Sequence, residues 1–248
     1  MLPWEMVLAH RYEEAAACYE TQLKKDPNDV GSLAGYATVL LCGQRYQEAL
    51  SLFQRANDLV DPRLKGESQP YSAEIGTILW LLGKREESIR TFRTAVDGIL
   101  NGTIGFADNA GGVSQGLLLW YVGVTAESEE TVIHALKYLR KLSKKKRIQY
   151  WPGPVALLAL GEKTFDDVVM AASGSNNLEG ATVNAANDLL IRRQLVVALF
   201  YSATKQRSEG LEDACKLKMA ACSRLKNPIL EYEWYLACAE AKDILLRP

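Results

Sequence analysis

Residues 33–56 read LAGYATVLLCGQRYQEALSLFQRA, and this stretch decides the fold class. Apolar and small residues recur at intervals of three and four from 33 to 40, and again from 49 to 56. The triplet Gly43-Gln44-Arg45 separates the two runs, and Asp61-Pro62 ends the second. Such spacing is typical of helices with one apolar face, so the stretch predicts a helix, a tight turn and a second helix. The stripe consists of Leu33, Tyr36, Ala37, Leu40, Ala49, Leu52, Phe53 and Ala56.

The same order of residues returns thirty-nine positions later, counted from Tyr36 to Ile75. An internal recurrence of this kind indicates stacked helix pairs, because each pair buries its apolar face only against the next. We expect a small residue such as Gly76 to let two helices approach closely while Phe92 fills the space beside it. The second copy consists of Ile75, Gly76, Leu79, the triplet Gly83-Lys84-Arg85, Ser88, Phe92 and Ala95.

Over residues 1–140 the chain resembles the tetratricopeptide-repeat (TPR) family, whose unit is about 34 residues long. With Leu33 at the fourth position of a unit, Ala37 and Ala56 take positions that are small in the family, and Phe53 takes the aromatic one. A unit with Ser72 at its fourth position fits in the same way, and a degenerate unit begins near Gly111. The resemblance implies an all-α superhelix of helical hairpins.

From Trp151 the pattern changes, because Trp151-Pro152-Gly153-Pro154 must break a helix. Short helices are expected at 155–160 and 165–172, a loop at 173–177, and longer helices at 184–205, 211–225 and 228–246. No stretch alternates apolar and polar residues between turn signals, so no strand is expected. We therefore expect an all-α fold: a TPR-like hairpin array over 1–150 and an irregular helical carboxy-terminal extension over 151–248, packed together as one continuous solenoid.

Composition excludes several classes of protein. The 248 residues are 48% hydrophobic and 24% charged, with a net charge of -1, so bulk charge points to no partner. The most apolar stretch, 189–203, contains Arg192 and Arg193, and the amino terminus lacks a signal-peptide pattern; we expect no membrane contact. Five cysteines with no C-x-x-C pair fit reduced thiols in the cytoplasm. We expect no metal site and no cofactor.

Two short motifs resemble catalytic ones. Residues 112–116 match the G-x-S-x-G nucleophile elbow around Ser114, but no buried strand precedes them and the only downstream histidine is His134. Residues 161–164 read GEKT, but Lys163 does not directly follow a glycine, and Leu157 takes the place of the first glycine that a phosphate-binding loop requires. The prediction is that the protein is not an enzyme; a hydrolase using Ser114 is the enzymatic alternative.

A dense basic run lies between Lys137 and Arg147, followed by Tyr150 and Trp151. Cations at the end of a helix stabilise it through the helix dipole, so the run has a purely structural explanation. It is also a possible basic partner surface, formed by Lys137, Lys141, Lys144, Lys145 and Arg147. An acidic protein is the favoured partner, because the chain's pI of about 6.2 is unlike that of a dedicated nucleic-acid binder.

The TPR resemblance also implies a concave groove lined by the first helix of each unit. Carried over residue by residue, the groove is apolar and aromatic, and Trp80 and Trp120 take equivalent places in it. Large aromatics are frequent anchors of protein interfaces, but the same tryptophans would be core if the carboxy-terminal helices covered them. Both alternatives stay open at this point. The expected groove residues are Thr38, Leu41, Thr77, Trp80, Leu117, Trp120 and Tyr121.

The carboxy-terminal half, including the ending EYEWYLA at 231–237, resembles small cytoplasmic bacterial immunity proteins of polymorphic toxins. That resemblance implies a protein that binds a cognate toxin domain and blocks its active site or its target-binding surface. The alternatives are a TPR scaffold or secretion chaperone and a nucleic-acid-binding regulator. The sequence leaves the oligomeric state open.

Overall fold

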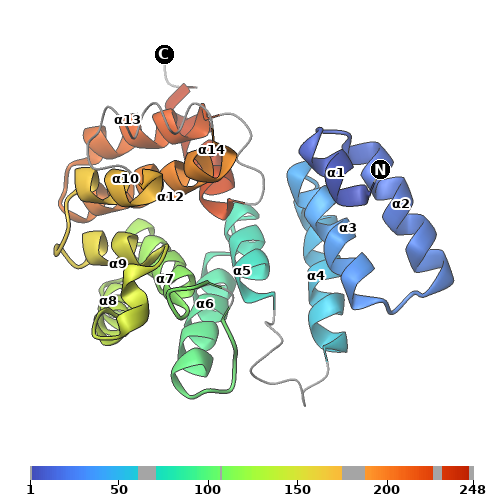
Figure 1. Cartoon of the computed structure of the whole chain (residues 1–248), viewed down its shortest axis with the longest axis horizontal. Coiled ribbons are helices and arrows are strands. Elements are labelled where there is room, and N and C mark those ends of the chain that lie inside the picture. Colours follow the sequence, from blue (N-terminus) through green and yellow to red (C-terminus); the bar gives the residue numbers. More distant parts are fainter. Residues whose placement is uncertain (1, 61–70, 107, 175–187, 226–230, 246–248) are drawn as a thin grey trace. The chain divides into compact units, whose positions relative to one another are not determined.

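The computed structural model describes residues 2–60, 71–106, 108–174, 188–225 and 231–245 (Figure 1). All regular elements in these ranges are helices, which confirms the predicted all-α class. The chain divides into two compact units, Met1–Gly105 and Phe106–Pro248. The expected boundary between 1–150 and 151–248 falls inside the second unit, because α7 (Val113–Thr125) contacts α9 (Gly153–Ala159) and α12 (Leu189–Ser208).

The first unit is a chain of helices in which each contacts the next. Asp29 begins α3 by accepting the Ser32 amide. The helices α3 and α4 contact each other, and their apolar faces include Leu33, Ala37, Phe53 and Ala56, all at most 1% exposed. The predicted stripe of residues 33–56 is thus largely core. The helices are α1 (Pro3–Leu8), α2 (Tyr12–Lys25), α3 (Val30–Cys42), α4 (Tyr46–Leu59), α5 (Ser72–Leu81) and α6 (Arg85–Leu100).

The second unit is built around α12, which contacts helices on both sides of it in the sequence. Its amino terminus is capped by Asp188, whose carboxylate accepts the amides of Leu190 and Ile191. The expected helices at 184–205, 211–225 and 228–246 correspond to α12, α13 and α14, although 184–187, 228–230 and 246 lie outside the described residues. The remaining elements are α8 (Glu129–Ser143), the 3-10 helix η2 (Lys146–Gln149), α10 (Phe165–Ser173), α13 (Glu212–Ser223) and α14 (Tyr232–Leu245).

One turn geometry recurs in the hairpins α1–α2, α3–α4, α5–α6, α7–α8 and α12–α13. A left-handed residue follows the first helix, and the next amide donates to the carbonyl five residues earlier, at 2.8 to 2.9 Å. The left-handed positions are His10, Gln44, Gly83, Glu127 and Gly210. His10 and Gln44 lie 34 residues apart, and both are followed by an arginine that pairs with a glutamate three residues on. Both units are therefore built from repeated helical hairpins.

Close helix approach depends on glycine at two of these hairpins. A Cβ atom at Gly76 would lie 2.6 Å from the Phe92 ring, and one at Gly116 would lie 2.5 Å from the Tyr138 ring. Neither distance is possible between real carbon atoms, so α5 and α6, and likewise α7 and α8, pack at the present distance only with glycine there. The expected pairing of Gly76 with Phe92 is confirmed.

Candidate functional site

The seven residues expected to line a concave groove lie mainly in the interior. Thr38 is half-buried, and the other six are at most 4% exposed. These six are Leu41, Thr77, Trp80, Leu117, Trp120 and Tyr121. These six side chains are therefore core, because a side chain without accessible surface cannot meet a partner unless the helices over it move.

In the second unit, residues of α12 and α14 contact Trp120 and Tyr121 and bury them. The ring of Trp120 stacks on Tyr201 of α12 at 6.4 Å between centroids, and Tyr121 contacts Phe200 at 4.7 Å. The Tyr121 hydroxyl also donates to Glu240 of α14 at 2.7 Å. The carboxy-terminal helices therefore use this face of α7 as core, which is the second of the two alternatives that the sequence left open.

Trp80 belongs to the first unit and is 4% exposed. The guanidinium carbon of Arg85 lies 3.7 Å from the centre of its ring, a cation–π contact at the turn between α5 and α6. Trp80 thus contributes to the packing of its own hairpin.

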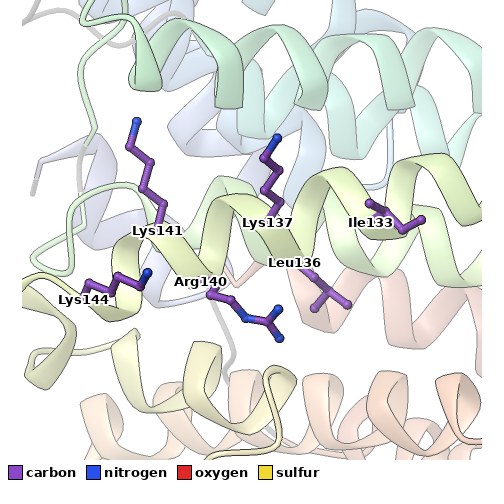
Figure 2. Close-up of a pocket in the computed structure, with 6 residues that line it drawn as sticks. All are labelled: Ile133, Leu136, Lys137, Arg140, Lys141 and Lys144. Carbon is purple, nitrogen blue, oxygen red and sulfur yellow. The ribbon is translucent and has the colours of Figure 1, made fainter.

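A surface of different character remains exposed on α8. Lys137, Arg140, Lys141 and Lys144 line a pocket of about 550 Å³ together with Ile133 and Leu136. Figure 2 shows Lys137 and Lys141 projecting from one side of the helix, and Leu136 and Arg140 from the other. The four cations are exposed, and Ile133 is 57% exposed. We call these six residues the α8 basic face.

The amphipathic pattern of α8 explains why this face stays open. The opposite side of the helix faces the core and carries Ala135, Tyr138 and Leu139, which are at most 2% exposed. Ser128 caps the amino terminus, and acidic Glu129 and Glu130 follow it, while the basic residues cluster toward the carboxy terminus. Cations in that position are favoured by the helix dipole. Within the described part of the chain, none of the four cations forms an ion pair.

The structure brings together three of the five residues predicted for a basic partner surface: Lys137, Lys141 and Lys144. Lys145 and Arg147 are exposed but lie beyond α8 and outside the pocket lining; the Arg147 guanidinium is 5.7 Å from the Phe106 ring. Arg140 and the two aliphatic residues were missed as site residues. The signal that could have found them was helical spacing, since Ile133 lies four residues before Lys137, Arg140 lies three after it, and Leu136 lies four before Arg140.

The catalytic alternative at Ser114 lacks its structural context. Ser114 lies in the first turn of α7, no strand occurs among the described residues, and its amide donates to Asp108 at 2.9 Å. Gly116 serves helix packing, as described above. In the ranges that the structure describes, no group of three His, Cys, Asp or Glu side chains is arranged to hold a metal ion.

A second cavity, of about 370 Å³, lies within the second unit near the starts of α7, α12 and α14. Its lining includes Arg193, Glu231 and Glu233, which the sequence did not single out because they are far apart along the chain or look like ordinary surface charges.

No helix in the described part of the chain combines the length and apolar character required to cross a bilayer. Comparison with protein-family models and with curated proteins returns no match in either case.

Proposed function

We propose that this TPR-like helical-repeat protein is not an enzyme and acts by binding another protein through the α8 basic face. The observation that carries the proposal is the group of four exposed cations around the aliphatic side chains of Ile133 and Leu136, none of which is in an ion pair within the described part of the chain. Because the net charge of the whole chain is only -1, this positive face is a local feature. Its complement is a partner surface with carboxylates around an apolar contact.

We propose more specifically that the partner is a toxin domain, as the resemblance to bacterial immunity proteins implies. The α8 basic face would then cover the active site or the target-binding surface of the toxin. Six of the seven groove residues are buried, so the basic segment is the better supported of the two contact surfaces that the resemblance allowed. The five cysteines are thiols and not disulfides, which agrees with a cytoplasmic site of action.

The test is co-expression with the product of the adjacent gene, followed by affinity purification and a growth assay for relief of toxicity. The variant is the pair Lys137→Glu and Lys141→Glu. The matched control is Lys24→Glu with Lys25→Glu, two exposed residues at the end of α2 that change the net charge equally. We expect the α8 pair to weaken the complex by about tenfold or more and the control pair by less than about twofold.

Three outcomes would contradict the proposal. If the neighbouring product neither binds nor loses toxicity, the immunity role is rejected. A complex that is insensitive to both charge reversals rejects the α8 basic face. Binding of nucleic acid that weakens steeply with salt and depends on Lys137 and Lys141 would instead identify a nucleic-acid-binding regulator.

A further inference from the structure

The cavity of the second unit is lined by both apolar and charged residues. Aromatic and aliphatic walls come from Trp151, Leu117 and Val197, and polar groups from Asp108, Arg193 and the segment 231–233. Three carboxyl groups, those of Asp108, Glu231 and Glu233, share this space with one guanidinium. The balance of charge in the lining is therefore negative.

Two of the three carboxyl groups are already compensated. Asp108 accepts the amides of Gly112 and Ser114, both at 2.9 Å, at the start of α7. Glu231 pairs with Arg193, with 2.6 Å between Oε1 and Nε. Glu233 is the carboxyl group with neither a cationic partner nor two backbone amides among the described residues.

Glu233 is 6% exposed. Apart from its own backbone, its one donor in the described part of the chain is the Tyr201 hydroxyl, at 3.0 Å from Oε1. Burial and the neighbouring charge of Glu231 raise the pKa of Glu233 to about 7. The titratable and charged groups around it are Arg193 and Tyr201 of α12, Cys222 of α13, Glu231 beside α14, and Asp108 across the cavity.

A buried carboxylate costs free energy unless a cation or several donors compensate it. The cavity beside Glu233 supplies room for such a group, and its aromatic lining from Trp151 and Tyr232 suits the face of an organic cation. An anion would meet three carboxyl groups. A metal ion lacks a suitable set of ligands in the part of the chain that the structure describes.

We propose that this cavity binds an organic cation with N–H donors, a guanidinium or a primary ammonium, which places its charge against Glu233 and Glu231. The cation displaces the proton that Glu233 carries below neutral pH, so binding and proton release are linked. Two sources share this chemistry: a free small molecule and the basic side chain of a partner protein. The inference is independent of the α8 basic face.

The probe is propylguanidinium, compared by calorimetry with propylurea, a neutral molecule of nearly the same shape. At pH 8 we expect propylguanidinium to bind with a Kd of about 1 mM or below and propylurea at least about tenfold more weakly. Because the pKa of Glu233 is about 7, propylguanidinium should bind about tenfold more weakly at pH 6 than at pH 8. Equal binding of the two probes, or no binding of propylguanidinium at pH 8, overturns the proposal.

The variant Glu233→Gln keeps the shape of the side chain and removes its charge. It should weaken propylguanidinium binding at least about tenfold at pH 8 and abolish the pH dependence. The matched control is Glu209→Gln, at the exposed end of α12, which should bind the probe like the unaltered chain. If Glu233→Gln fails to fold, the pH dependence and the propylurea comparison in the unaltered chain decide the matter.

The peptide acetyl-Gly-Arg-Gly-amide separates the two sources of the cation. Binding as tight as that of propylguanidinium supports recognition of an arginine side chain of a partner. Binding of propylguanidinium without binding of the peptide supports a free small molecule. Both results support a cation site, whereas peptide binding that survives Glu233→Gln counts against it.

Discussion

Replacing Gly116 by alanine tests the close approach of α7 and α8. The added methyl carbon would lie 2.5 Å from Cδ1 of Tyr138 and 2.7 Å from Cδ2 of Leu139. Ordinary contacts between carbon atoms are about 3.5 to 4.0 Å, so the neighbours must move by about 1 Å. Tyr138 has little freedom to do so, because its ring is 2% exposed and its hydroxyl donates to the Gly112 carbonyl at 2.8 Å.

The expected magnitude follows from two opposing terms. Overpacking a core typically costs about 1 to 3 kcal/mol, and alanine in place of glycine within a helix returns up to about 1 kcal/mol. We expect a net loss of about 1 to 2 kcal/mol in the free energy of unfolding. In a chain of this size the melting temperature should fall by about 2 to 8 °C.

The control is Gly31→Ala in the first turn of α3. Its methyl group would meet only the Asp29 carboxylate, at 3.7 Å or more, so the same substitution should leave stability unchanged or slightly higher. Urea unfolding followed by circular dichroism measures both variants. In a Tyr138→Phe background the ring is released from Gly112, and Gly116→Ala should cost less than in the unaltered chain. Our account of the α7–α8 contact is wrong if Gly116→Ala is as stable as Gly31→Ala.

Two further predictions concern charged groups in the second unit. Arg207 donates two hydrogen bonds to Glu240, at 2.6 and 2.9 Å, and both side chains are 16% exposed. Arg207→Met should lower the free energy of unfolding by about 3 kcal/mol, whereas Arg45→Met, at an exposed ion pair, should change it little. Equal urea midpoints for the two variants would refute this prediction. The raised pKa of Glu233, about 7 against an ordinary 4.5, means that the folded chain holds this proton more tightly than the unfolded chain. The stabilising contribution of this proton is complete below pH 4.5 and is lost as the pH rises through 7. The free energy of unfolding should therefore fall with pH by up to about 1.4 kcal/mol per pH unit. Glu233→Gln should remove this slope from free energies of unfolding measured between pH 5 and 7.5.

Much of the hairpin architecture could be predicted because its signals are local. Ala37 with Phe53, and Gly76 with Phe92, lie within one helical hairpin, so periodicity in a short window reveals them. The fifth hairpin, α12–α13, was not recognised as one. Its left-handed Gly210, with Ala203 seven residues before it and Met219 nine after it, repeats the arrangement of Gly83, Gly76 and Phe92. This was the signal that could have found it.

The candidate sites were harder to predict. The sequence fits Trp80 and Trp120 equally well as interface anchors and as core residues. The pattern of one helix shows which of its faces is apolar, but it does not show what covers that face. The basic run was visible, but only the helix geometry separates Lys137, Lys141 and Lys144 from Lys145 and Arg147. The cavity around Glu233 joins residues from 108 to 233 and has no signature in any short stretch.

The sequence by itself determined that this chain is helical, where most of its helices lie and how several successive helices pair, since turn residues and apolar spacing act over a few residues. Only the tertiary structure decided that α12 covers Trp120, that α8 keeps its cations exposed, and that Arg193, Glu231 and Glu233 share one cavity. The physical reason is that burial and charge pairing depend on contacts between distant segments. Such contacts exist only once the helices have packed.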